Sequence, residues 1–314
     1  MPTERQNQLD RQSLIDRFYD EISKINWQNI NSQTQKNVQI GLVGSKAQIS
    51  KIKKWLSTTD YKLYRKYGAS LKNKPNNDRI DNHTIEIVVS KNKLNSKLVK
   101  NADFCIVVSK YQDLVIELGK TAYVFDKNKQ DIPAKCHADF TSLSFALSYN
   151  FPVFRYSHAY IEINNSSIQN MIWASATATP NVIPGPHQAI TAPVEAISDV
   201  VILTLNEFKM LFELVGISGF IINPFRCLIE LGMVIGGAAL AQNTGTNLSG
   251  KLLGGAGIVA KGAVAFAFTY AIGDAVYFYL QTGQQASAKF IKDRVKYWEK
   301  EGKKVAKEEQ KKKK

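Results

Sequence analysis

The 314-residue chain contains few of the residues that build disulfide frameworks or metal centres, with only three cysteines and four histidines. No two cysteines and no two histidines show metal-ligand spacing, so no metal site is predicted. Scattered single cysteines exclude a disulfide-stabilised fold and indicate a reducing compartment. Lone histidines, and a histidine beside a cysteine, are expected in turns or at the surface. These residues are His83, His158, His187 and the pair Cys136–His137.

The sequence also lacks the motifs of common enzymes. It contains no GxSxG nucleophile elbow, no GxxxxGK[ST] phosphate loop and no DxxG switch motif. We therefore predict no catalytic residue, no cofactor and no small-molecule substrate. The N-terminal residues MPTERQNQLDRQSL form no apolar core, so no signal peptide is expected and a cytoplasmic location is predicted.

Positive charge is abundant but unevenly distributed. The net charge is +14, and residues 286–314 supply half of it, with twelve basic and five acidic residues. Residues 182–283, in contrast, hold only four basic residues and six acidic ones. Such a tail favours a polyanionic partner, either an anionic lipid surface or a nucleic acid, although lysine-rich tails also serve solubility alone.

Short apolar runs separated by helix-length segments predict an α/β domain with a mostly parallel sheet. An amphipathic helix over 10–27 and a polar linker over 28–36 are expected before it, and a loop over 70–82 within it. The predicted helix of 47–56 follows the first strand. The five predicted strands cover 38–44, 84–90, 103–109, 121–126 and 151–157.

Four prolines within 177–193 exclude a continuous helix there and mark a domain boundary. Beyond it, long helical patterns predict an all-α, glycine-rich domain at 194–215, 224–242 and 248–281, and then a charged helix at 286–309. The predicted divisions are 1–35 (helix and linker), 36–176 (α/β domain), 177–283 (apolar helical domain) and 284–314 (basic helix and tail).

Four stretches of the α/β domain resemble Era-like GTPases in order and in strand character. IGLVG (40–44), NADFCIVVS (101–109), GKTAYVFDK (119–127) and FPVFRYS (151–157) are similar to strands of that family. The resemblance implies a P-loop GTPase-like fold over roughly 120 residues. It implies no GTPase activity, because the segment after Gly44 lacks the glycines that would turn backbone amides toward phosphates.

Two groups of residues would contact a nucleotide if one bound. Gly44 and Lys46 lie where the phosphate loop would be, but no hydroxyl residue follows the lysine. Asn128, Lys129 and Asp131 form a literal NKxD sequence, displaced by two residues from the position that the strand register requires. The first domain is therefore interpreted as a degenerate, pseudo-GTPase domain.

The helical domain contains two segments that are apolar enough to consider membrane contact. Gly232 and Gly236 have the GxxxG spacing that permits close helix packing. Residues 262–280 number nineteen, enough to cross a bilayer, and only Asp274 interrupts them. A compact soluble bundle stays open as the alternative, because a carboxylate is costly in lipid.

The stretch IPGPHQAITAPVEAISDVVILTLNEFKMLFELVGISG (183–219) resembles the start of the GTPase-associated domain-of-unknown-function family 697. TYAIGDAVYFYL (269–280) is similar to the closing segment of that family. Asn206 stands where a glutamine is expected. The resemblance implies a neighbouring GTPase-type domain and a place at or near a membrane, and it adds no catalytic residue.

The leading hypothesis is a non-catalytic, membrane-associated adaptor on the cytoplasmic face of a membrane, bound to lipid or to a membrane protein. A GTP-binding switch with an unconventional loop and a nucleic-acid binder are the alternatives, and a homo-oligomer stays open. The predicted anionic-surface contacts are Lys289, Lys292, Arg294, Lys296, Lys300, Lys303 and Lys304.

Overall fold

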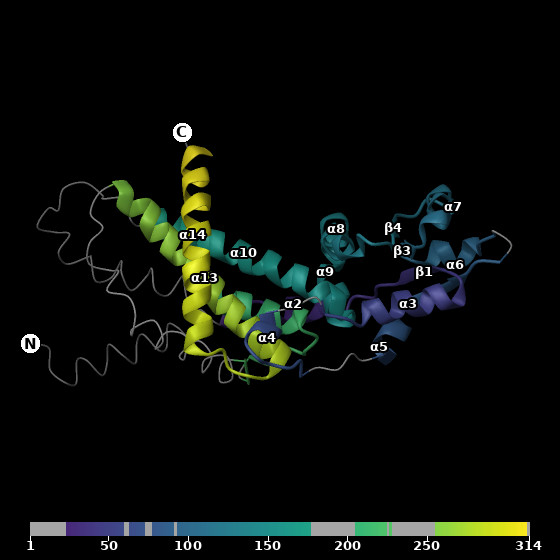
Figure 1. Cartoon of the computed structure of the whole chain (residues 1–314), viewed down its shortest axis with the longest axis horizontal. Coiled ribbons are helices and arrows are strands. Elements are labelled where there is room, and N and C mark those ends of the chain that lie inside the picture. Colours follow the sequence, from purple (N-terminus) through teal and green to yellow (C-terminus); the bar gives the residue numbers. More distant parts are fainter. Residues whose placement is uncertain are drawn as a thin grey trace, which may run out of the picture.

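The computed structural model describes residues 23–59, 63–72, 77–90, 93–176, 205–224, 226–227 and 255–312. A sheet with its covering helices lies at one end of the long axis, and three long helices lie at the other (Figure 1). Most of the predicted helix at 10–27, the proline-rich boundary and the Gly232–Gly236 pair lie outside the described residues.

The sheet consists of four parallel strands, as the apolar runs predict. The order is β2-β1-β3-β4, so the first strand in sequence lies in the interior of the sheet. Their bounds are β1 Ile40–Gly44, β2 Thr84–Val88, β3 Phe104–Val107 and β4 Ala122–Val124. The mostly parallel α/β class is therefore confirmed.

Alternate residues of the two interior strands point to opposite faces of the sheet. Leu42 and Ile106 face a core that they share with α3 (Lys46–Leu56), α8 (Ile132–Asp139) and α9 (Ser144–Asn150). Val43 and Val107 face a second core, which α6 (Ser96–Asn101) and α7 (Gln112–Glu117) cover. Both faces of these two strands are thus buried, which explains why β1 and β3 are apolar along their whole length.

Three local predictions are wrong. The expected fifth strand, 151–157, is the start of the long helix α10 (Pro152–Ala176). The expected linker at 28–36 contains α2 (Trp27–Thr34), and the expected loop at 70–82 contains α5 (Asn77–Asn82). The first error has a clear cause: a short buried apolar run fits a strand or a helix equally well, and proline is favoured in the first turn of a helix.

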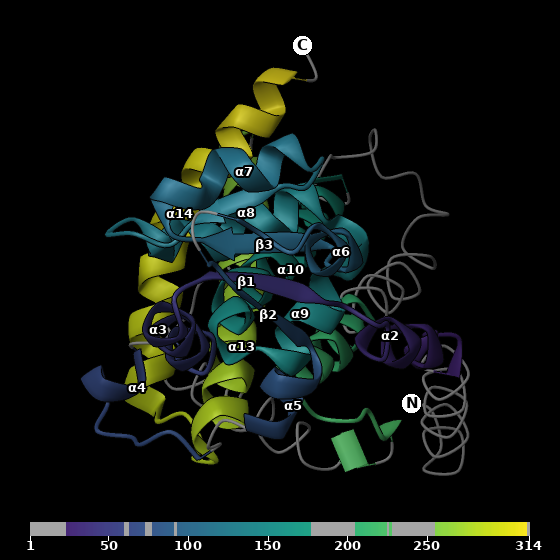
Figure 2. The same ribbon diagram turned by 90° about the vertical axis from the view of Figure 1, so that its right-hand side faces the viewer.

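The helical part is built around α13 (Gly255–Thr282), which packs against α10 and α14 (Ala288–Lys312). A further helix over 205–217 joins the same core and contacts α2 through Gly216. α13 and α10 approach closely, since a side chain on Gly273 would collide with Ile163. Viewed from the sheet end, α14 rises along one side, and its C-terminal end extends beyond the neighbouring elements (Figure 2).

The predicted helix at 286–309 is confirmed as α14, and the apolar stretch ending near 281 as α13. Within α13, Gly262–Thr282 is long and apolar enough to cross a membrane by composition alone, with a mean hydropathy of 1.4. In this fold 72% of that window is buried by protein. The packing therefore accounts for its hydrophobicity as that of a core helix.

Candidate functional site

The carboxyl ends of β1 and β3 form the edge where an open parallel sheet of this order binds ligands. Gly44 ends β1, and Ser45 then caps α3 in a reciprocal arrangement with Gln48. The Ser45 amide donates to Gln48 Oε1 at 2.8 Å, and the Gln48 amide donates to Ser45 Oγ at 3.4 Å. The chain itself thus uses amides that a phosphate would otherwise bind. Lys46 is exposed on the first turn.

The NKxD sequence lies beyond β4, in a turn that leads into α8. The Asn128 amide donates to Asp126 Oδ1 at 2.7 Å, and Lys129 to Asp131 form one turn of 3₁₀ helix. The Lys129 ammonium lies 5.5 Å from the centre of the Phe125 ring. These contacts are those of a self-contained turn, and they provide no geometry specific to a purine base.

On α14, lysines repeat every three or four residues on the exposed side. Residues at this spacing share one face of a helix. The opposite side carries Phe290 and Ile291, both buried, and Trp298, partly buried. We name the exposed row the lysine stripe; it consists of Lys289, Lys292, Lys296, Lys300, Lys303 and Lys307.

Three of the predicted surface cations form ion pairs. Arg294 is on the packed side, where its Nε donates to Asp274 Oδ2 at 2.5 Å. Lys304 is exposed and pairs with Glu301 at 2.9 Å, and Lys303 pairs with Glu299 at 2.7 Å. Of the predicted set, Arg294 is therefore not available to a surface.

Asp274, in the middle of the apolar helix, is fully buried and accepts three side-chain hydrogen bonds. Besides Arg294, Trp298 Nε1 donates to Oδ2 at 2.7 Å, and the Tyr160 hydroxyl donates to Oδ1. Burial raises the pKa of Asp274, while the Arg294 charge and these hydrogen bonds act in the opposite direction. Asp274 thus joins α10, α13 and α14.

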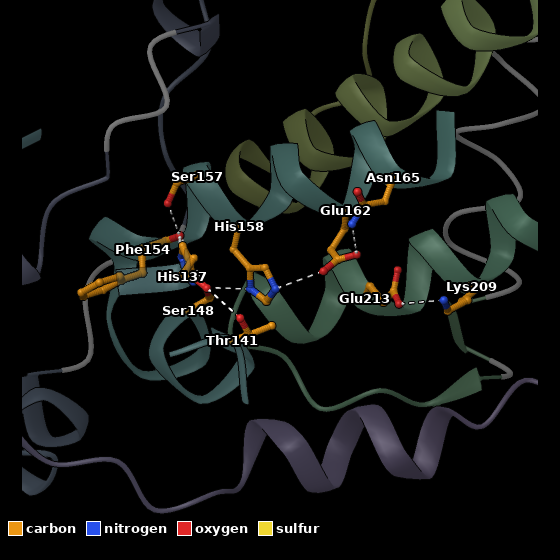
Figure 3. Close-up of polar contacts among 10 residues, drawn as sticks. All are labelled: His137, Thr141, Ser148, Phe154, Ser157, His158, Glu162, Asn165, Lys209 and Glu213. Atoms are coloured by element: carbon orange, nitrogen blue, oxygen red, sulfur yellow. Dashed lines mark hydrogen bonds and ion pairs between the residues drawn. The ribbon is translucent and has the colours of Figure 1, made fainter. Parts of the chain in front are cut away.

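A chain of polar side chains lies between α8, α9 and α10 (Figure 3). His158 Nδ1 lies 3.0 Å from Ser148 Oγ, and its Nε2 lies 3.4 Å from Glu162 Oε1. The ring of His137 stacks on that of His158, with centroids 4.8 Å apart. His137 Nε2 bonds to the Phe154 carbonyl at 3.0 Å, while its Nδ1 is buried and has no partner in the described part of the chain. Both histidines are buried, which corrects the expected turn or surface positions.

Burial shifts the titration of this group. The pKa of His137 falls to about 3, because burial and the neighbouring His158 both disfavour its charged form. Burial pushes the pKa of Glu162 upward, but the hydrogen bond and charge of His158 outweigh that effect and lower it. Burial and Glu162 together raise the pKa of Glu213 to about 7, with Lys209 opposing at 3.5 Å.

The order Ser148, His158 and Glu162 resembles a nucleophile, a base and an orienting acid, but the geometry does not support catalysis. The Ser148 and His158 side chains are 0% and 2% exposed. A cavity of about 260 Å³ lies beside Glu162, Lys209 and Glu213, and it is not lined by the serine or the histidine. A substrate in this cavity would therefore not reach the hydroxyl.

Sequence reasoning missed this polar chain and Arg155, a buried cation at the start of α10. His158 and Glu162 have the i, i+4 spacing of neighbours on one helix face, and this signal becomes visible only once the segment is read as helical. Among the described residues, no group of three or more His, Cys, Asp or Glu side chains could hold a metal ion.

Comparison of the chain with protein-family models, with curated proteins and with solved structures found no match.

Proposed function

We propose that the chain is a non-catalytic adaptor that docks on an anionic membrane surface through the lysine stripe of α14. The observation that carries the proposal is the orientation of α14: its apolar side is packed on α13, and its lysines face away from the core. Each lysine brought near an anionic leaflet contributes about 1 kcal/mol of binding free energy.

The buried Asp274–Arg294 pair supports the proposal because it fixes which side of α14 faces outward. Lys289, Lys292, Lys296 and Lys300 are exposed and form no ion pair within the part of the chain that the structure describes. A fixed, unpaired row of cations binds a charged surface better than a mobile tail of the same charge, since less conformational freedom is lost.

On this proposal the sheet domain is a degenerate relative of Era-like GTPases that serves as a scaffold. The parallel order β2-β1-β3-β4 is consistent with a doubly wound nucleotide-binding fold. The capping box at the start of α3 supports the proposal that this domain has lost nucleotide binding, because its amides bond within the chain. The resemblance of 183–219 to family 697 also favours a site near a membrane, and it remains part of the proposal.

The burial of α13 favours docking over spanning, because the only long apolar helix of the described residues already packs against protein. We therefore propose peripheral association on the cytoplasmic face of the membrane. High salt would release a peripheral protein of this kind, whereas a spanning one would need detergent.

Co-sedimentation with liposomes tests the proposal. The full chain should pellet with phosphatidylserine-containing vesicles and not with neutral ones, and less so as salt rises. Replacing Lys292, Lys296 and Lys300 by Gln should remove about 3 kcal/mol of binding free energy and so weaken binding by about a hundredfold. The matched control is the same change at Lys93, Lys97 and Lys100, which are exposed and lie outside α14.

Three results would redirect the proposal. Equal weakening by both triple variants would mean that net charge acts, and not the stripe. A stripe-dependent shift with duplex RNA or DNA, without liposome binding, would favour the nucleic-acid alternative. Micromolar binding of labelled GTP would favour the switch alternative and would contradict the scaffold assignment of the sheet domain.

A further inference from the structure

A second cavity, of about 240 Å³, lies where the sheet domain meets the helical part. The end of α3, the short helix α4 (Leu63–Lys66), the start of α10 and the end of α13 all contribute to its wall. Its cationic members are Arg65 and Arg155, and no acidic side chain of the described residues lines it.

Arg155 is held in a built position in this wall. It is only 8% exposed, and its guanidinium donates to the carbonyls of Ser148 at 3.1 Å and Tyr149 at 3.4 Å. Gly219 closes over it with a φ of +85°, and a Cβ there would lie 2.4 Å from Arg155 Nη2. Both the hydrogen bonds and the glycine fix the plane of the guanidinium.

The charge of Arg155 has no carboxylate partner among the described residues. Burial, together with the nearby Arg79, lowers the pKa of Arg155 to about 10, which still leaves it cationic at neutral pH. A buried charge that is satisfied only by neutral carbonyls is costly, and an anion entering the cavity would offset that cost.

A hydroxyl group also lacks a partner in this wall. Ser57 and Thr58 donate to the carbonyls of Lys54 and Trp55, so their protons are already used. Thr59 Oγ1, in contrast, is buried and has no hydrogen-bond partner among the residues that the structure describes. Its hydroxyl proton can therefore be donated to a ligand, and it lies in the same wall as the buried Arg155 and the exposed Arg65.

The start of α10 adds to the positive potential. Pro152 lines the cavity and begins a helix of 25 residues, whose macrodipole is positive at this end. From these observations we propose that the cavity is a binding site for the phosphate group of a small phosphomonoester. Arg155 and Arg65 would pair with phosphate oxygens, and Thr59 would donate to a third.

This site is independent of the lysine stripe, so the two proposals fail separately. Calorimetric titration with inorganic phosphate, at constant ionic strength, should give saturable one-to-one binding of about millimolar affinity or tighter. The variant with glutamines at Lys292, Lys296 and Lys300 should bind phosphate like the wild type. Absence of saturable binding to the folded full chain would overturn the proposal.

Matched variants locate the site. Arg65→Gln should weaken phosphate binding about tenfold or more, whereas Lys66→Gln, which removes the same charge from the next residue of α4, should leave it unchanged. Thr59→Val keeps the shape and removes the hydroxyl, and should weaken binding several-fold. Arg155→Lys should abolish most binding, because lysine lacks the fixed fork.

If Arg155→Lys does not fold, phosphate binding by Arg65→Gln and Thr59→Val still tests the site. Equal effects of Arg65→Gln and Lys66→Gln, or no effect of Thr59→Val and Arg65→Gln, would overturn the site. Vesicles with a phosphatidylinositol monophosphate, compared with phosphatidylserine vesicles of equal charge, separate the two sources of the group. If the protein prefers the phosphatidylinositol monophosphate vesicles and Arg65→Gln loses that preference, the ligand is a lipid headgroup. If the protein binds phosphate but shows no such preference, the ligand is soluble.

Discussion

Arg294 Nε lies 2.5 Å from Asp274 Oδ2, so the lysine-rich helix α14 is joined to the apolar helix α13 by a buried ion pair. The aspartate is 0% exposed and the arginine side chain 12%. Stacking of Trp298 on Tyr270, with ring centroids 3.6 Å apart, adds to the same contact. The pair therefore determines how the lysine stripe is presented.

Removing one partner of this pair should be strongly destabilising, because the other charge is left buried. We expect Asp274→Asn and Arg294→Met each to lower the free energy of unfolding by about 3–5 kcal/mol. Urea denaturation followed by circular dichroism measures this. Lys303→Gln, which breaks the exposed pair with Glu299, is the control and should cost less than about 1 kcal/mol.

A double-mutant cycle shows whether the two residues act as a unit. The variant with both Asp274→Asn and Arg294→Met should lose less stability than the sum of the single changes, because no unpaired charge remains. Additive losses would contradict the ion pair as the main contact between the helices.

The parts of the fold that the sequence predicted are those where a local pattern decides the structure. Short, mostly apolar runs predicted all four strands, and the runs are continuous in β1 and β3, where every residue is buried. Helical spacing predicted α3 and α14. The run at 151–157 was misread because Val153 and Phe154 are buried in the sheet core as part of a helix. Local pattern does not distinguish these two cases.

The features of the sites depend on contacts between distant residues. Asp274 was recognised as a costly charge and Arg294 as a surface cation, but their pairing requires the turn that brings α14 back along α13. His137 and His158 stack although 21 positions separate them, and Arg155 meets Gly219 across 64 positions. Spacing on one helix or strand carries no signal for such contacts.

Acid should destabilise the protein through His137. Its pKa is lowered to about 3, so the folded state takes up this proton less readily than the unfolded chain, whose histidine titrates near 6.5. The contribution of His137 to the free energy of unfolding is therefore fully present above about pH 6.5. It decreases as the pH falls toward 3, by about 1.4 kcal/mol per pH unit. Glu213 acts in the opposite direction over part of this range, so the slope due to His137 is measured as the difference in denaturation midpoints between the wild type and His137→Gln from pH 7 to pH 5.

His137→Gln removes the titrating group and can keep a donor for the Phe154 carbonyl. Over the same range, the slope of stability against pH should differ between this variant and the wild type by about one proton, or about 1.4 kcal/mol per pH unit, with the variant gaining stability relative to the wild type as the pH falls. An unchanged slope in His137→Gln would contradict the buried neutral ring.

The effect of Glu213 on the pH dependence of stability should be opposite to that of His137. Burial and Glu162 raise its pKa to about 7, so the folded state holds a proton that the unfolded chain releases near 4.5. Its contribution is favourable at low pH and is lost as the pH rises through about 7. Glu213→Gln should therefore gain about 1–3 kcal/mol over the wild type at pH 8 and almost nothing at pH 4.5, measured by urea denaturation. An equal effect at both pH values would contradict the shift.

Ser45 caps the start of α3 and does not bind a phosphate, which can be tested by substitution. Ser45→Ala should lower the free energy of unfolding by about 1 kcal/mol, through loss of the acceptor for the Gln48 amide. In a GTPase-type loop the same region would bind phosphate, so magnesium and GTP would raise the melting temperature of the wild type. Here we expect no such rise at millimolar GTP, with the wild type and Ser45→Ala behaving alike. A GTP-dependent rise that Ser45→Ala abolishes would mean that the cap opens for a nucleotide, and the sheet domain would then be a switch.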